Sequence, residues 1–210
     1  MKTENVVLMR MAKESLNGKW VLAIATYLVY VLIVGSFASV GSIPSFLFPA
    51  LELTSSLVSL IISGPFILGL AIFALSISRN KEARLEQIFQ GFSNFGTALG
   101  AYILITIFVI LWMLLLIIPG IIAAISYSMT FFIIADDKSI GVMEAIDKSK
   151  KMMYGYKWKF FRLVLRLFGL ALLCILTLGI GFLWLWPYAE VCAAKFYEDV
   201  KANSLATENI

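Results

Sequence analysis

The chain has 210 residues, 61% of them hydrophobic and only 14% charged, with a formal net charge of +4. Soluble domains carry about 25% charged residues, so this composition, with a mean hydropathy of +0.93, predicts an integral membrane protein and excludes a soluble catalytic domain. The chain contains no histidine, the commonest metal ligand and general base. Cys174 and Cys192 lack the spacing of a zinc site or redox motif. We therefore predict no metal and no cofactor.

The first pair of apolar spans covers residues 20–38 and 54–78. Basic residues flank the pair at both ends, and clusters of Lys and Arg mark the cytoplasmic side of a membrane. The pair is therefore predicted to cross the membrane and return. Ser36-Phe37-Ala38 also resembles a signal-peptide cleavage site, but the apolar stretch before it is long for a signal peptide, and the repeat described below needs this helix.

The second pair of spans lies in the uncharged run of residues 97–135. As a single helix this run would be about 60 Å long at ~1.5 Å per residue, which is twice the ~30 Å thickness of the hydrocarbon core of a bilayer. Because both flanks are basic, the run is expected to cross the membrane an even number of times. We predict that Pro119 and Gly120 form the turn between two helices, since proline and glycine break a helix and let the chain reverse.

The third pair of spans covers residues 157–177 and 179–197, joined by the sequence TLGIG. Gly179 and Gly181 are predicted to form this turn. Pro65 and Pro187 fall inside predicted helices, where proline kinks the helix rather than reversing the chain. The predicted fold is thus all-α, with six transmembrane helices arranged as three hairpins in the cytoplasmic membrane and with both termini in the cytoplasm.

A short polar segment with helical periodicity precedes each hairpin, which predicts a threefold internal repeat. The repeats cover residues 1–80, 81–137 and 138–200, followed by a polar tail, 201–210. Repeats of one orientation are related by an axis along the membrane normal. We expect the amphipathic helices to lie in the cytoplasmic interface with their apolar faces toward the lipid. Their apolar positions are Leu8, Met11, Ala12 and Leu16, then Leu85, Ile88, Phe89 and Phe92, then Val142, Ala145, Ile146, Ser149 and Met153.

The third amphipathic segment is the most basic of the three. Anionic lipid headgroups should attract it, by about 1 kcal/mol for each Lys or Arg near the membrane surface. A connector that only seats the bundle at the interface is the simpler alternative. The candidate interfacial residues are Lys148, Lys150, Lys151, Lys157 and Lys159.

Two ionisable residues, Arg166 and Glu190, lie about 12 Å into the last two predicted helices at ~1.5 Å per residue. Ionisable residues inside a membrane are costly and are therefore candidates for function. Because their depths match in neighbouring helices, we predict that they face each other as an ion pair. Such a pair either locks the two helices together or lines a polar cavity that receives a ligand headgroup or a proton. Arg162, one turn nearer the cytoplasm, can extend to the interface.

The remaining candidates lie at the predicted membrane boundaries. Asp136 and Asp137 end a span on the cytoplasmic side, where they are expected to cap the next helix. Two adjacent acids also resemble half of a metal site, but no His, Cys or further acid is near them in sequence. Trp184, Trp186 and Tyr188 are typical of an aromatic belt at the outer interface.

Several stretches of the chain resemble a bacterial family known as domain of unknown function 975. That family is similar to the membrane domain that accompanies some glycerophosphodiester phosphodiesterases, which implies a membrane location and proximity to lipid metabolism. It implies no active site, because the phosphodiesterase chemistry belongs to a separate soluble domain. The resemblance spans nearly the whole chain and is carried by LNGKW, GPFILGLAIFALSISR, LWMLLLIIPGIIAAISYSMTFFIIADD, AIDKSKKMMYGYKW and LTLGIGFLWLWPYAEVCAAKFYEDV.

Three functions are compatible with these features. A non-enzymatic membrane protein that binds a membrane or cytoplasmic partner protein, or that organises an envelope complex, fits the absence of catalytic motifs and is favoured. A carrier of a lipid or other amphiphile would use a cavity near Arg166 and Glu190. An intramembrane enzyme would need a cleft with at least two converging titratable groups. We expect contacts with anionic lipid headgroups and no nucleic-acid partner.

Overall fold

The computed structural model describes the backbone of residues 3–40 and 49–208 and the side chains of residues 3–36 and 54–204. This part of the chain is helical and contains no strand, which confirms the predicted all-α class. The elements in chain order are α1 (Asn5–Leu16), α2 (Trp20–Val40), α3 (Pro49–Ser78), the 3-10 helix η1 (Leu85–Asn94), α4 (Phe95–Leu115), α5 (Ile117–Tyr127), α6 (Thr130–Asp136), α7 (Val142–Met152), α8 (Lys157–Leu176) and α9 (Phe182–Glu208).

Three segments of the described chain are long and apolar enough to cross a membrane: Thr54–Ser78, Leu85–Leu115 and Ile117–Asp136. A fourth is obtained if α1 and the described part of α2, which are bent by 94°, are taken as one span. The helices α8 and α9 are not among them, because charged residues interrupt the apolar sequence of both. The structure thus supports a membrane protein, and the six predicted spans remain a prediction.

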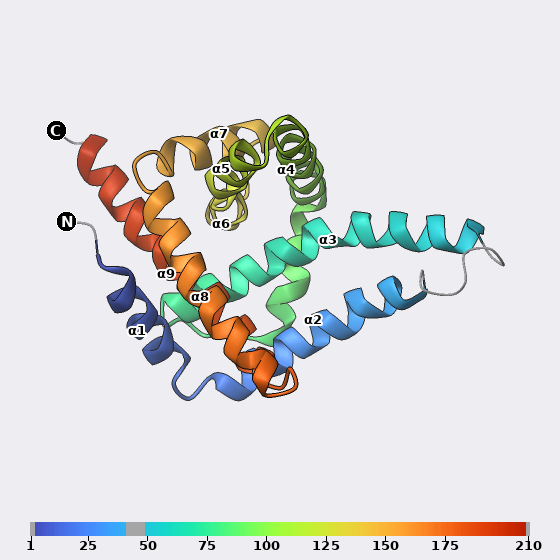
Figure 1. The fold of residues 1–210 in the computed structure, drawn as a ribbon, viewed down its shortest axis with the longest axis horizontal. Helices are drawn as coiled ribbons and strands as arrows, with labels where there is room; N and C mark the ends of the chain where they lie inside the picture. The colour runs from blue at the N-terminus through green and yellow to red at the C-terminus, as the bar shows by residue number, and fades with distance from the viewer. Residues whose placement is uncertain (1–2, 41–48, 209–210) are drawn as a thin grey trace.

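The helices do not form a set of parallel rods. In Figure 1, α2 and α3 run side by side across the view, whereas α4 and α5 are seen nearly along their axes. The helices α8 and α9 lie close together near the N-terminal helix α1. The polar residues after position 200, which were expected to form a tail, continue α9 as a helix to Glu208. Ser36-Phe37-Ala38 likewise lies within the helical backbone of α2.

The turn between α4 and α5 lies at Leu116, three residues before the predicted Pro119-Gly120. Leu116 has an extended backbone, with φ −161° and ψ 141°. Pro119 falls in the first turn of α5, where proline is tolerated because the first N–H groups of a helix have no intrahelical partner. A Cβ added to Gly120 would overlap the side chain of Met113. Glycine at this position therefore allows α4 and α5 to approach closely and does not make the turn.

The remaining predicted turn and kink residues lie in the elements in which the sequence predicted them. Gly179 and Gly181 lie between α8 and α9, where the turn was predicted, and the φ of +87° at Gly179 favours glycine. Pro65 and Pro187 lie inside α3 and α9 respectively.

The three amphipathic segments bury most of their predicted apolar positions against protein, whereas Met11, Phe89 and Phe92 are exposed. Leu8, Ala12 and Leu16 of α1 are buried in the core, and α1 contacts α8 and α9. The segment η1 packs on α3, where Ile88 is fully buried. The helix α7 contacts α4, α5 and α6, and its Ser149 hydroxyl donates a hydrogen bond to the carbonyl of Ser126 at 2.8 Å. The same apolar periodicity serves either environment, so it could not distinguish lipid from a neighbouring helix.

Candidate functional site

An ion network joins the ends of three helices that are far apart in sequence. The carboxylate of Asp136, at the end of α6, contacts the guanidinium of Arg79 at 2.6 Å and the ammonium of Lys201 at 2.6 Å. The Tyr197 hydroxyl donates a hydrogen bond to the same carboxylate at 2.8 Å. Arg79, which directly follows α3, also pairs with Glu198 of α9 at 2.7 Å. The network therefore fixes the ends of α3 and α6 against α9.

The electrostatics of this network are those of a structural clamp. Burial disfavours the charged guanidinium of Arg79, but hydrogen bonds to Glu198 and Asp136 outweigh this cost and raise its pKa. Hydrogen bonds between ionised groups are stronger than neutral ones. Both oxygens of Asp136 are occupied by these donors. Asp136 is thus poorly placed to act as a general base.

A groove of about 570 Å³ opens beside this network, and we call it the α6–α7–α9 groove. Lys148 and Lys151 line it from α7, are exposed, and form no ion pair with any residue in the described part of the chain. Tyr154, in the turn after α7, also lines the groove and is 83% exposed. The remaining lining residues are Ile133, Asp136, Asp137, Met152, Tyr156, Tyr197, Lys201 and Ser204.

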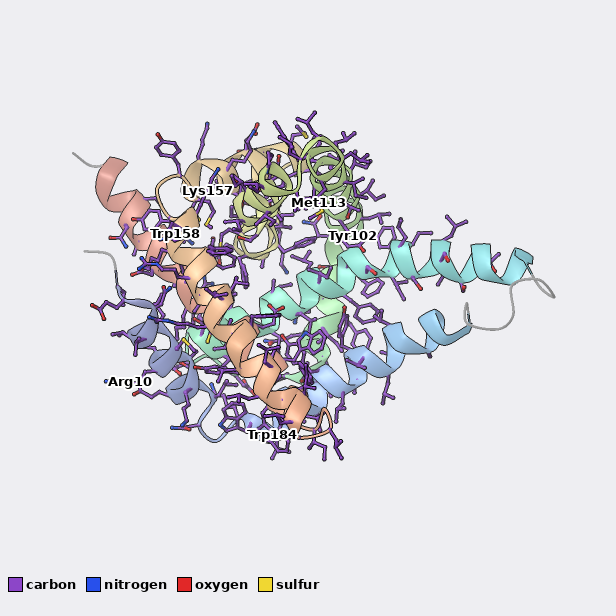
Figure 2. All side chains as sticks on the ribbon, viewed as in Figure 1. Arg10, Tyr102, Met113, Lys157, Trp158 and Trp184 are labelled. Atoms are coloured by element: carbon purple, nitrogen blue, oxygen red, sulfur yellow. The ribbon has the colours of Figure 1, made fainter. Side chains whose placement is uncertain are left out.

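The other predicted interfacial lysines differ from these two. Lys150 faces away and pairs with Asp147 at 3.6 Å on the surface of α7. Lys157 is half-buried at the start of α8, beside the exposed Trp158 (Figure 2). The side chain of Lys159 is buried, and its ammonium contacts the carboxylate of Asp199 at 2.6 Å. Lys159 is therefore a structural partner between α8 and α9 and not a contact for lipid headgroups.

Asp136 and Asp137 do not cap the following helix as expected. The N-cap position of α7 is Gly141, and no side chain caps that helix. Asp137 instead accepts hydrogen bonds from the backbone N–H of Ser139 at 3.0 Å and from its hydroxyl at 2.6 Å. These hydrogen bonds lower the pKa of the Asp137 carboxyl. The two acids thus have separate roles, since one joins helix ends and the other stabilises a local turn.

Arg166 and Glu190 are not an ion pair in the structure, although both are described. The exposed Arg166 lines a groove of about 480 Å³ together with Arg162 and the first residues of α1. Glu190 lies within electrostatic range of the phenols of Tyr27 and Tyr30 on α2. The reason is the rotation of α8 about its axis, which buries Leu163 and directs Arg162 and Arg166 outward.

Sequence reasoning singled out Asp136 only as an expected helix cap, and it missed the association of Asp136 with Arg79 and of Arg79 with Glu198. Tyr197 and Lys201 were also missed. These two residues are four apart on α9 and so share one face of the helix, which is the signal that could have found them.

The arrangement offers binding chemistry more readily than catalysis. No three His, Cys, Asp or Glu side chains come together as metal ligands in the part of the chain that the structure describes. The acids of the α6–α7–α9 groove already accept hydrogen bonds. Its lysines Lys148 and Lys151 form no ion pair with a described residue, although Lys148 lies within electrostatic range of Asp137, so both ammonium groups can contact an external anion.

Comparison with known proteins gives a family and no closer relative. No curated protein matches the chain, and no solved structure matches it. Residues 1–126 and 113–204 match the family described as Protein of unknown function (DUF975). Since these two matches together cover nearly the whole sequence, the chain belongs to this family.

Proposed function

We propose that this chain is a non-enzymatic, multi-pass protein of the bacterial cytoplasmic membrane that binds an acidic segment of a partner protein in the α6–α7–α9 groove. The observation that carries the proposal is the pair of exposed lysines, Lys148 and Lys151, beside the exposed Tyr154. Tyrosine is enriched among the residues that dominate binding energy at interfaces. Unpaired lysines attract acidic partners and speed their association.

The walls of the groove support this proposal because the ion network holds them in place. Asp136 and Tyr197 belong both to the network and to the groove. A preformed surface reduces the ordering cost of binding. The groove also adjoins the ends of α6 and α7, where the positive charge predicts the cytoplasmic side. A cytoplasmic partner, or the cytoplasmic segment of a membrane protein, is therefore the expected ligand.

We further propose that the chain is a threefold repeat with six spans and both termini in the cytoplasm. The packing of the three amphipathic segments supports the repeat. The segment of the second repeat, η1, packs on α3 of the first, and α7 of the third packs on α4, α5 and α6 of the second. The first segment, α1, packs on α8 and α9 of the third repeat. Each segment thus contacts the preceding repeat in cyclic order.

The partner is tested by placing a photo-crosslinking amino acid at Tyr154 in cells that express the full chain. We expect a protein adduct whose crosslinked peptide is acidic. Lys148→Glu together with Lys151→Glu should abolish the adduct, since both unpaired charges are reversed. The matched control is Lys150→Glu, because Lys150 lies outside the groove and already pairs with Asp147. An adduct that survives the double substitution, or a crosslinked peptide that is basic, contradicts the proposal.

A carrier of a lipid or other amphiphile is the second candidate function. The groove at Arg162 and Arg166 favours it, because two exposed arginines there could bind an anionic headgroup. The predicted cavity between Arg166 and Glu190 does not support the carrier function, because Arg166 lines the groove beside α1 whereas Glu190 lies near Tyr30. A carrier would require the chain to move an amphiphile between vesicles or leaflets, which a transport measurement with the purified protein tests directly.

A further inference from the structure

One face of α8 changes from basic to apolar along its length. Arg162, Arg166, Leu170, Cys174 and Thr177 follow one another at intervals of three or four residues. Residues at this spacing lie above one another on the same side of a helix. The first two residues line the 480 Å³ groove, and the last three line a second groove of about 440 Å³. The two grooves therefore adjoin along a single stripe of α8.

The basic end of this stripe has unneutralised positive charge. Arg162 and Arg166 are exposed and have no ion pair with any described residue. Lys159 also lines this groove, but Asp199 neutralises it. Glu4 is the acid among the lining residues, so the two arginines leave one net positive charge there. A guanidinium group can donate two parallel hydrogen bonds to two oxygens of one phosphate. A phosphate group is therefore the ligand that best fits Arg162 and Arg166.

The apolar end of the stripe has the character of a site for a hydrocarbon chain. Its groove lies between α8 and α9 and the junction of α1 and α2. Lys13 is the charged residue in this lining, at the end that α1 contributes. The other lining residues are Trp20, Leu170, Leu173, Cys174, Thr177, Gly181, Trp184, Leu185 and Tyr188. Figure 2 shows Trp158 near the start of α8 and Trp184 near its far end, so an indole side chain flanks each end of the stripe.

We propose that an anionic phospholipid binds along this face, with its phosphate on Arg162 and Arg166 and an acyl chain against Leu170, Cys174 and Leu185. The Cα atoms of Arg166 and Cys174 are separated by about 12 Å along the helix at ~1.5 Å per residue. That length suits a glycerol backbone followed by the first part of an acyl chain. Arginine attracts the anionic phosphate, and the apolar groove offers van der Waals contacts to the methylene groups of the acyl chain. This site is distinct from the α6–α7–α9 groove and does not depend on the proposed protein partner.

The test is lipid titration followed by native mass spectrometry of the full chain, purified and delipidated in a mild detergent. The probes are phosphatidylglycerol, phosphatidylcholine with the same acyl chains, and water-soluble glycerol phosphate. We expect one tightly bound phosphatidylglycerol and weaker binding of phosphatidylcholine. Arg162→Gln with Arg166→Gln should weaken the binding of phosphatidylglycerol about tenfold or more, since two charge-assisted contacts are lost. Arg10→Gln is the matched control, because Arg10 is exposed on α1 and lines neither groove.

A second variant separates a lipid from a free phosphate compound. Cys174→Trp fills the apolar groove but keeps both arginines. It should therefore weaken the binding of phosphatidylglycerol and leave the binding of glycerol phosphate unchanged. Glycerol phosphate that binds as tightly as the lipid overturns the lipid assignment and indicates a site for soluble phosphate compounds. Unchanged lipid binding in the double arginine variant, with the same melting temperature as the parent protein, overturns the site itself.

Discussion

Asp136 shows how one side chain can connect helices from three parts of the sequence. Its carboxylate accepts contacts from Arg79, Tyr197 and Lys201, while only 12% of the side chain is exposed. Ion pairs on an exposed surface contribute little to stability. A partly buried carboxylate with several donors differs, because removing it leaves Tyr197 and Lys201 without their acceptor. The residue is therefore expected to matter for stability more than for chemistry.

Replacing Asp136 with alanine should lower the stability of the protein by about 1–3 kcal/mol. The value is at the low end for a buried charge, because Arg79 and Lys201 are partly exposed and Arg79 retains Glu198. The measurement is thermal unfolding in detergent micelles. The control is Glu82→Ala, which breaks the exposed pair between Glu82 and Arg84 and should change stability by less than about 0.5 kcal/mol. Equal effects of the two substitutions would show that the network at Asp136 is not a clamp.

At the scale of the helices, the sequence located elements along the chain better than it oriented them. The predicted end of the second span at position 78 is the last residue of α3, and the third pair of spans begins at Lys157, the first residue of α8. The Arg166–Glu190 pair failed because equal depth fixes the position along a helix axis but not the rotation about it. Each residue turns the helix by about 100°, so Arg166 points outward although Leu167, its neighbour, packs inward.

Only part of the α6–α7–α9 groove could be predicted from the sequence. Its lysines on α7 were recognised from sequence, because the segment is basic and periodic. The ion network that braces the groove was not predicted, because Asp136 was interpreted only as a helix cap. The network depends on contacts between residues about 60 positions apart or more, such as Asp136 with Lys201. Local periodicity carries no information about such long-range packing.

Close packing between elements depends on Gly69 of α3. A Cβ at this position would overlap the backbone carbonyl of Ile88 in η1. Gly69→Ala should therefore push η1 away from α3 and lower stability by about 1–3 kcal/mol, the usual cost of overpacking. The matched control is Gly96→Ala in α4, where an added Cβ meets nothing within 4 Å. That control should be neutral or stabilising by up to about 1 kcal/mol, since alanine favours a helix.

Thermal unfolding of the two glycine variants in the same micelles measures this difference. A Gly69→Ala protein that melts at the temperature of the Gly96→Ala protein would mean that η1 does not depend on close contact with α3. Small residues at helix contacts allow backbones in a membrane to approach. The outcome therefore also tests the close contact between α3 and η1 that Gly69 allows.

For the whole molecule, the number of membrane crossings depends on the pair α8 and α9. The helix α8 carries Lys159, Arg162 and Arg166 in its first half, and charged residues near the centre of a bilayer cost several kcal/mol. If the pair spans the membrane, these charges must stay at the cytoplasmic end and the turn at Leu178 must reach the outer face. If the pair remains on the cytoplasmic side, the spans are α2, α3, α4 and the segment formed by α5 and α6.

Cysteine labelling in intact cells distinguishes these two topologies. Leu178 is 94% exposed and Tyr154 is 83% exposed, so a cysteine at either position should be reachable. The background is Cys174→Ala with Cys192→Ala, which removes the native thiols. Six spans predict that Leu178→Cys reacts with a membrane-impermeant maleimide from outside, while Tyr154→Cys reacts only after permeabilisation. If both positions require permeabilisation, α8 and α9 do not cross, and the basic stripe of α8 then lies entirely at the cytoplasmic leaflet, where anionic headgroups are available to Arg162 and Arg166.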